Sequence, residues 1–322
     1  MGTNPENGSK TGCNSGSDCR VGRILSIIGP TGSGKTSLAL ALARRTGAEI
    51  LSTDAMQVYQ EMNIGTAKPS LAEQHEIRHH LVNWVRPDET FSVARFVSLA
   101  QEVIARAARE RTPLIACGGT PLYFKSLFWG LFEGPSADQS VRRRLAEHSG
   151  VELHAKLQTI DAPAAARIHP SDRKRLIRAL EVYELTGKPI SSFQTEWSAD
   201  KLRYPTVWIG LRWDVAELNR RINARVKDMM AAGWLEEVRQ ISRIFPEWSG
   251  TAAEATGYHE LREHLAGRLS LEDAVEQIKI ATRQLARRQM KWFRRFPDVN
   301  WLEGNRPAQE NIEKAMEIWI TK

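Results

Sequence analysis

The segment GPTGSGKT, from Gly29 to Thr36, limits the possible folds more than any other part of the chain. The apolar run ILSII precedes it, and a helix-forming run with Leu38 and Leu42 follows it, so the order is strand, glycine loop, helix. Glycines let backbone N–H groups converge on an anion, and the start of the helix adds positive potential. The segment predicts a P-loop that holds a diphosphate or a triphosphate.

Alternation of strand-like and helix-like segments continues after the loop. A short apolar run (Ile50, Leu51) leads to Asp54, a helical pattern covers Phe96 to Ala107, and the apolar run PLIAC leads to Gly118–Thr120. This order predicts an α/β fold, a P-loop parallel sheet with helices on both faces. Because ligands of such sheets bind at the carboxyl ends of the strands, we expect the loop, Asp54 and Thr120 to lie together.

The middle of the chain has a different character. Residues 136–202 are charged and helix-like, and YPTVWIGLRW then reads as a strand that returns to the sheet. We therefore expect a helical insertion domain at 136–202 within a core of 23–135 and 203–322. Further helices are expected at Val215–Ala231, Leu235–Ile244 and Leu271–Phe296. Residues 1–22 are rich in Gly, Ser and Asn and are expected to form a disordered tail.

The charge and composition of the chain indicate what kind of partner it binds and where it is located. The net charge is +7, and five basic residues recur every four positions in the last long helix: Lys279, Arg283, Arg287, Lys291 and Arg295. This excess favours a polyanionic partner such as nucleic acid. No apolar stretch is long enough to cross a membrane and no signal peptide is evident, so a cytoplasmic location is expected. The three cysteines show no metal-ligand spacing.

The residues alone leave the reaction open. Lys35 supplies charge to a phosphate and the Thr36 hydroxyl can ligate Mg²⁺, yet no carboxylate follows PLIACGGT, where many ATPases hold magnesium. Asp54 is the obvious carboxylate near the loop, and it could hold magnesium or act as a base. A kinase of small metabolites, with the insertion as a lid, and a non-catalytic RNA-binding protein that senses nucleotide both remain open at this point.

Several motifs together resemble the bacterial tRNA dimethylallyltransferases, also called tRNA isopentenyltransferases. The resemblance runs from Arg23 to Leu302, with these segments in the family's order: GPTGSGKT, STDAMQVYQEMNIGTAKP, GGTPLYFKSL, PSAD, AARIHPSDRKRLIRALEVYELTGKPIS and ATRQLARRQMKWFR. It implies transfer of the dimethylallyl group from dimethylallyl diphosphate to the exocyclic amine of adenosine 37, in tRNAs that read codons beginning with U. The P-loop would then hold the departing diphosphate.

The resemblance also implies roles for residues. Asp54 would be the base, with Thr120 and Lys35 also catalytic, and Mg²⁺ would lie on Thr36. The residues expected to bind diphosphate are Gly29, Thr31, Gly32, Ser33, Gly34, Lys35, Thr36, Arg221 and Arg225. Those expected to bind the tRNA anticodon stem-loop are Asp54, Ala55, Met56, Gln57, Thr120, Arg142, Lys174, Arg175, Leu176, Ile177, Arg178, Gly257 and Tyr258. The insertion would clamp the stem, and a monomer is expected.

The chain departs from the family pattern at a few positions. Ala55 stands where the family usually has Ser, and Thr256 and His259 flank the GY pair in place of commoner residues. Ala55 lacks the hydroxyl of the usual Ser and so loses any contact from it, and the changes at Thr256 and His259 are expected to weaken one phosphate contact. A relative that prenylates free adenosine monophosphate would share the P-loop, but the basic helices and the long insertion favour tRNA as the acceptor.

Overall fold

The computed structural model describes residues 22–131, 134–193 and 202–321. The expected tail, together with Cys13 and Cys19, falls outside these residues except for residue 22. The chain divides into two compact units. One holds the described residues up to Phe124 and from Tyr204 onward, and the other is Lys125–Arg203. The sequence placed the insertion at 136–202, and the boundary of the second unit lies earlier, within a helix.

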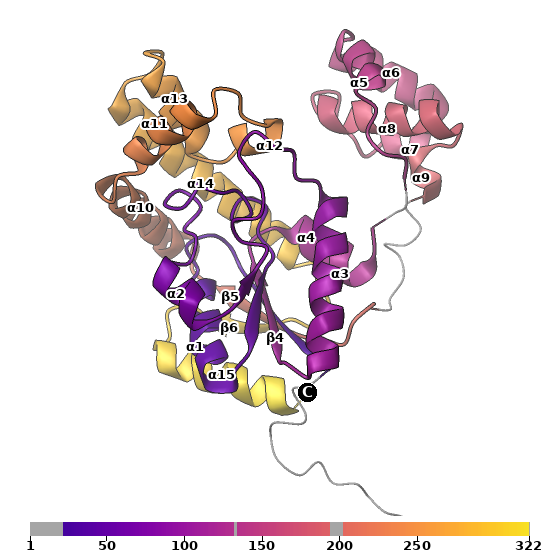
Figure 1. The fold of residues 1–322 in the computed structure, drawn as a ribbon. Helices are drawn as coiled ribbons and strands as arrows, with labels where there is room; N and C mark the ends of the chain where they lie inside the picture. The colour runs from indigo at the N-terminus through magenta and orange to yellow at the C-terminus, as the bar shows by residue number, and fades with distance from the viewer. Residues whose placement is uncertain (1–21, 132–133, 194–201, 322) are drawn as a thin grey trace, which may run out of the picture. The chain divides into compact units, whose positions relative to one another are not determined.

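The first unit is built on a six-stranded sheet whose paired strands are all parallel, in the order β3-β2-β4-β1-β5-β6. Figure 1 labels β4, β5 and β6 of this sheet. Its strands are β1 (Ile24–Ile28), β2 (Glu49–Ser52), β3 (His79–His80), β4 (Leu114–Gly118), β5 (Thr206–Arg212) and β6 (Asn300–Glu303). β1 and β4 are buried along their whole length, which is why they read as continuous apolar runs. The α/β fold predicted from the sequence is confirmed.

The helices of this unit follow the strands along the chain. They are α1 (Lys35–Thr46), α2 (Leu71–Glu76), α3 (Val93–Glu110), α4 (Pro121–Trp129), α10 (Val215–Ala231), α11 (Trp234–Ile244), α12 (Gly250–Ala253), α13 (Tyr258–Leu265), α14 (Leu271–Phe293) and α15 (Ala308–Thr321). The expected helices at 215–231, 235–244 and 271–296 correspond to α10, α11 and α14. The unit boundary lies within α4.

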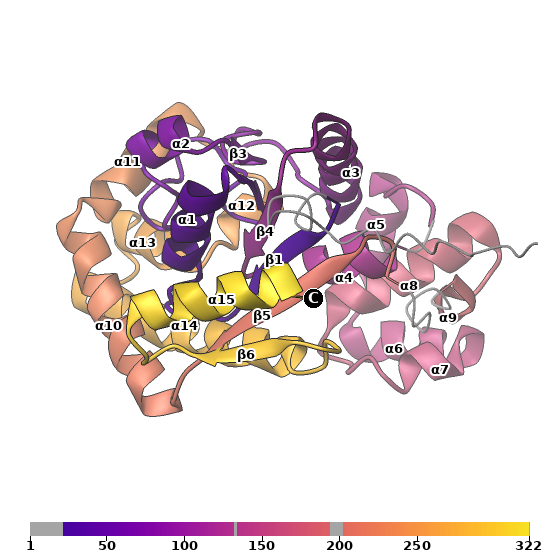
Figure 2. The same ribbon diagram turned by 90° about the horizontal axis from the view of Figure 1, so that it is seen from below.

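Helices cover both faces of the sheet. On one face α1 and α15 pack over the central strands and bury a cluster that includes Leu42, Ile115 and Trp319 (Figure 2). On the other face Trp208 of β5 meets Phe124 of α4 and Phe296 just after α14, with ring centroids 5.7 and 5.3 Å apart. Alternate residues of a strand point to opposite faces, so β5 contributes to both cores.

The second unit has a small helical core of its own. It contains α5 (Gln139–Ala146), α6 (Gly150–Ile160), α7 (Ala162–Ala165), α8 (Arg173–Thr186) and α9 (Ile190–Phe193). Apolar residues of these helices, among them Leu153, Leu157 and Leu176, are fully buried against one another. Ser149 begins α6 with a capping box to Glu152, and Asp172 caps α8, so local sequence signals set both helix starts.

Candidate functional site

The ends of three neighbouring strands bring the P-loop, Asp54 and Thr120 together. The Thr53 N–H donates to the Cys117 carbonyl at 2.8 Å, and the Ala55 N–H donates to the Thr120 hydroxyl at 3.0 Å. Gly118 is required for this approach, because a Cβ there would lie 2.0 Å from the Thr53 carbonyl oxygen. The convergence expected from the strand order is therefore present in the structure.

Side chains from other segments bind the carbonyl groups of the P-loop. The Arg221 Nε donates to the Gly32 carbonyl, and the Trp213 indole N–H donates to the Ser33 carbonyl, each at 3.0 Å. The Arg221 guanidinium also lies over the Trp213 ring, 4.2 Å from its centroid. Gly34 begins α1 in a left-handed conformation without a capping side chain. Two carbonyls of the loop are therefore occupied and the start of α1 has no capping side chain, an arrangement suited to an anion.

Gly29 shows why this loop needs glycine. Its φ is +156°, and a Cβ there would lie 2.9 Å from the Ser33 hydroxyl and 3.1 Å from the Leu211 carbonyl. Any other residue would be strained at this φ and tightly packed against the Leu211 carbonyl. The Ser33 hydroxyl is buried and has no hydrogen-bond partner among the described residues.

Opposite charges gather beside the loop. A cavity of about 20 Å³ is lined by Lys35, Thr36, Asp54 and Gln57, among other residues, and has room for about one water molecule. Burial lowers the pKa of Lys35, and the Asp54 carboxylate opposes this shift while Arg225 adds to it. Burial also lowers the pKa of Arg225, again opposed by Asp54. An anion such as diphosphate would stabilise both cations.

The segment after Asp54 is ordered by short contacts. The Met56 N–H donates to Asp54 Oδ1 at 2.9 Å, and the Ser52 hydroxyl donates to Gln57 Oε1 at 2.9 Å. Ala55, Met56 and Gln57 are all partly exposed. The Cys117 thiol lines the same cavity, and its burial raises its pKa to about 12, so it stays protonated at neutral pH.

Gln289 on α14 is a residue of this site that the sequence did not single out. Its Oε1 accepts the Thr31 N–H at 2.8 Å, and its Nε2 donates to the Gly119 carbonyl at 2.6 Å. The side chain is only 7% exposed. One amide thus connects the P-loop to the turn that carries Thr120. The sequence could have indicated Gln289 only through its position in the family segment ATRQLARRQMKWFR, because no local pattern predicts a contact with residues so distant in the chain.

The tRNA-binding residues expected in the second unit surround a buried carboxylate. Glu181 is fully buried and pairs with Arg142 at 2.8 Å and with Arg178 at 2.7 Å. Arg175 is exposed and lies 3.4 Å from Asp172, and Lys174 is exposed. Leu176 is fully buried in the core of the unit and Ile177 packs against that core, so these two apolar side chains support the helix.

Gly257 and Tyr258 lie in the first unit, at the start of α13. The Tyr258 ring is fully buried and its hydroxyl donates to Glu237 at 2.7 Å. A direct side-chain contact of Tyr258 with RNA is therefore absent from this conformation, because the ring packs inside the protein. Burial raises the pKa of Tyr258, as does the nearby Glu237 carboxylate.

The five basic residues of the stripe that runs along α14 and just past its end divide into two groups. Lys279 is buried and pairs with Glu276, and Arg283 donates to the Asn223 amide oxygen at 2.6 Å. Arg287, Lys291 and Arg295 are exposed, and the described part of the chain offers them no ion-pair partner. Only this second group presents uncompensated charge to a partner.

The described residues contain no group of three His, Cys, Asp or Glu side chains arranged around a metal. Oxygen ligands suit Mg²⁺, and the Thr36 hydroxyl and the Asp54 carboxylate line the same cavity, so the site fits an ion held mainly by substrate phosphates and water. No helix in the described ranges is both long and apolar enough to cross a bilayer.

Comparisons with known proteins all identify the same family. Residues 57–296 match the IPP transferase family. A tRNA dimethylallyltransferase 1 from Citrifermentans bemidjiense is 42% identical over 281 residues, covering 87% of this chain and 92% of the relative. The solved tRNA isopentenylpyrophosphate transferase of Bacillus halodurans is 35% identical, with a TM-score of 0.68 and 92% and 94% of the two chains covered. A eukaryotic dimethylallyltransferase acting on tRNA is 28% identical with a TM-score of 0.77, covering 90% of this chain and 78% of the other.

Proposed function

The chain belongs to the IPP transferase family, and we propose that it is a tRNA dimethylallyltransferase that modifies adenosine 37 in tRNAs reading codons that begin with U. The observation that supports this most is the arrangement at the strand ends. A phosphate-binding loop with Lys35 faces one carboxylate, Asp54, across a small cavity, and no second strand-end carboxylate lines that cavity among the described residues. This suits an enzyme that releases a diphosphate better than one that transfers a phosphoryl group.

The proposed reaction is a substitution at an allylic carbon. The exocyclic nitrogen of adenosine forms a bond to that carbon, the carbon–oxygen bond to diphosphate breaks, and the electron pair leaves with the diphosphate. The P-loop N–H groups, Lys35 and Arg225 stabilise the charge on the leaving group. Arg221 acts by fixing the Gly32 carbonyl, in addition to any charge it supplies. Mg²⁺, when bound through Thr36, would neutralise further charge on the diphosphate.

Asp54 is the proposed proton acceptor. The exocyclic amine of adenine is barely basic, so the carboxylate orients it and takes its proton as the new bond forms. Its position is set by the Met56 N–H on Oδ1, and Thr120 lies beside it through the Ala55 N–H. The target base must leave the stacked anticodon loop to reach this site.

The tRNA-binding roles of both units are part of the same proposal. In the first unit Ala55, Met56, Gln57 and Gly257 would lie near the extruded base. In the second, Arg142, Lys174, Arg175 and Arg178 would contact the anticodon stem, with Glu181 holding two of these arginines in place. We place the protein in the cytoplasm, as a monomer.

The test is transfer of labelled dimethylallyl from its diphosphate to unmodified tRNA with Mg²⁺. Label is expected in tRNA with adenosine at position 37 and absent from the same tRNA with guanosine there. Asp54→Asn should reduce transfer by roughly 10²- to 10⁴-fold while tRNA affinity stays within a few-fold. Folded protein that binds tRNA but transfers no label, or that turns over ATP without tRNA, would overturn the proposal.

A further inference from the structure

A carboxylate on α11 holds the loop that follows the Asp54 segment. Glu237 Oε2 accepts the N–H groups of Asn63 and Ile64 at 3.0 and 2.8 Å, and its Oε1 accepts that of Gly65 at 3.4 Å. Three successive backbone donors on one carboxylate make a strong, charge-assisted contact. The Tyr258 hydroxyl adds a fourth donor at 2.7 Å, from the start of α13.

The contact is reinforced by packing around a buried tryptophan. A Cβ at Gly65 would lie 2.2 Å from Trp234 Nε1, and a Cβ at Gly257 would lie 2.0 Å from Trp234 Cη2. The indole is therefore enclosed by two glycines from distant segments. Its ring meets the Tyr258 ring at a centroid distance of 5.6 Å. Figure 1 shows α11 and α13 next to each other, so both helices contribute to this hold on the loop.

The held loop in turn contacts a side chain beside the reacting groups. Gln57 Nε2 donates to the Thr66 and Ala67 carbonyls at 3.4 and 3.3 Å, while its Oε1 accepts from Ser52. Gln57 lines the same cavity as Asp54 and Lys35. The loop at 63–67 therefore connects the two side chains, because Glu237 binds its first three N–H groups, the Ala67 N–H closes it on the Ile64 carbonyl, and Gln57 binds its last two carbonyls.

We propose that Glu237 is a positioning residue for the acceptor side of the reaction, which rests on the function proposed above. By fixing the loop at 63–67 it fixes Gln57, whose amide oxygen has a second lone pair for a donor on the edge of a nucleobase. The phosphate loop is held separately, by Arg221, Trp213 and Gln289. Loss of Glu237 should therefore weaken use of tRNA and leave diphosphate binding intact.

Glu237→Gln tests this, with Glu236→Gln as the matched control. Glu236 is the preceding residue on the same helix, is half-exposed at its side chain, and pairs with Arg239. For Glu237→Gln we expect kcat/KM for tRNA to fall on the order of 10- to 100-fold, and exchange of the Asn63–Gly65 amide hydrogens to accelerate by a similar factor. The Kd of inorganic diphosphate with Mg²⁺ should stay within about twofold, since that site keeps its own contacts. The control should match the wild type in all three.

Tyr258→Phe is a second, milder variant that can be used if Glu237→Gln does not fold. It removes only one hydrogen-bond donor to Glu237 and keeps the aromatic ring. The same pattern with a smaller loss is expected. Parallel loss of diphosphate binding and tRNA use in both variants would show a general structural role and overturn the proposal, as would unchanged tRNA kinetics. The wild type could also transfer no label while Glu237→Gln still accelerated exchange of the Asn63–Gly65 amide hydrogens. The proposed function would then be wrong, but the role of Glu237 in fixing the loop would be confirmed.

Discussion

Lys35 is a cation whose charge the free protein disfavours. Burial lowers its pKa, whereas a bound diphosphate would restore the charge. Affinity for inorganic diphosphate should therefore be highest below the pKa of Lys35 in the free protein and fall as pH rises through it, with proton uptake on binding. Calorimetric titration in two buffers of different ionisation enthalpy measures that uptake.

Lys35→Arg is the matched variant for this experiment, since arginine stays charged at high pH. It should bind diphosphate without proton uptake at this position and with a flatter alkaline fall in affinity. Equal proton uptake in both proteins would mean that the proton goes to another group, and Lys35 would then be charged before the anion arrives.

Gln289 gives a second prediction at the scale of one residue. Gln289→Met keeps the size of the side chain but leaves the Thr31 N–H and the Gly119 carbonyl without their partner. Removing a partner from a buried polar group costs about 1–3 kcal/mol, so urea unfolding should show that loss. Diphosphate affinity should fall as well, because the P-loop loses an anchor. Gln284→Met, an exposed position on the same helix, should change neither quantity.

Residues of this kind mark the limit of prediction from the sequence. The P-loop, Asp54 and Thr120 could be predicted because each follows an apolar strand and parallel strands end at one edge. Gln289 and Glu237 could not, since the backbone groups that they bind in the P-loop and in the loop at 63–67 lie more than a hundred residues away in the sequence. Arg142 and Arg178 are expected to bind tRNA from the resemblance, but the sequence around Glu181 indicates only a surface ion pair to Arg178 and not the buried carboxylate that both arginines share.

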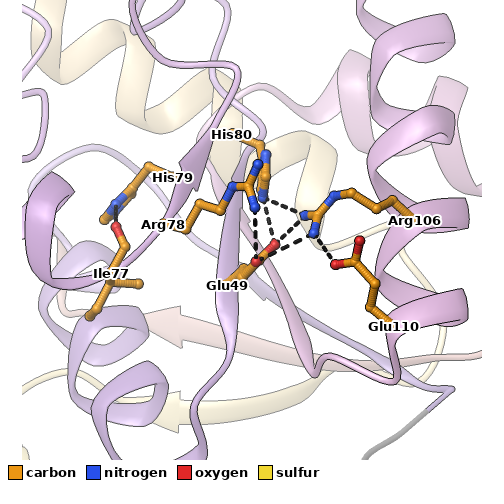
Figure 3. Close-up of polar contacts among 7 residues, drawn as sticks. All are labelled: Glu49, Ile77, Arg78, His79, His80, Arg106 and Glu110. Carbon is orange, nitrogen blue, oxygen red and sulfur yellow. Dashed lines mark hydrogen bonds and ion pairs between the residues drawn. The ribbon is translucent and has the colours of Figure 1, made fainter.

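The smaller strands were missed for a related reason. β3 has only two residues, and β6 buries only Leu302, so it lacks the apolar run that marks the equally short β2. β3 is held by side chains as well as by its ladder to β2. Figure 3 shows His80, Arg78 and Arg106 gathered around Glu49, while His79 turns away and its Nδ1 lies 2.7 Å from the Ile77 carbonyl.

This cluster around Glu49 predicts how the β2–β3–α3 region responds to acid. Burial alone would raise the pKa of Glu49, but hydrogen bonds from Arg106 and His80 outweigh it and hold the pKa below its usual 4.5. A depressed carboxyl pKa stabilises the fold above the unfolded value and loses that contribution as pH falls through the folded value. Glu49→Gln should cost roughly 1–3 kcal/mol of unfolding free energy at pH 7.

The cost of Glu49→Gln should shrink as the pH falls from about 4.5 through the lower pKa of the folded protein, because the wild-type carboxylate becomes protonated first in the unfolded chain and then in the folded one. Urea unfolding of both proteins at a series of pH values measures the difference. Glu110→Gln is the control, because Glu110 pairs with the same Arg106 from an exposed position. A difference that is independent of pH would show that Glu49 acts through packing and not through its charge.

At the scale of the whole molecule, the net charge of +7 favours a polyanionic partner. Only basic side chains that are exposed and not paired within the protein can contact such a partner. Lys279 and Arg283 are occupied by neighbouring side chains, whereas Arg287, Lys291 and Arg295 are exposed on α14 and just after it. Counterion release from the RNA makes binding weaken with salt in proportion to the number of phosphates contacted. Within the stripe, only the three exposed residues should therefore contribute to the salt dependence of tRNA binding.

Lys291→Ala tests this assignment, with Lys314→Ala as the control, at an exposed position on α15 of the same unit. The slope of log K for tRNA against log salt should become shallower by about 0.7 to 0.9 for each phosphate that the variant no longer neutralises, and affinity should fall equally for all tRNAs. Lys314→Ala should leave the slope unchanged. If the two variants gave the same slope as the wild type, α14 would lie outside the RNA interface, and the arginines of the second unit would have to carry the electrostatic part of binding.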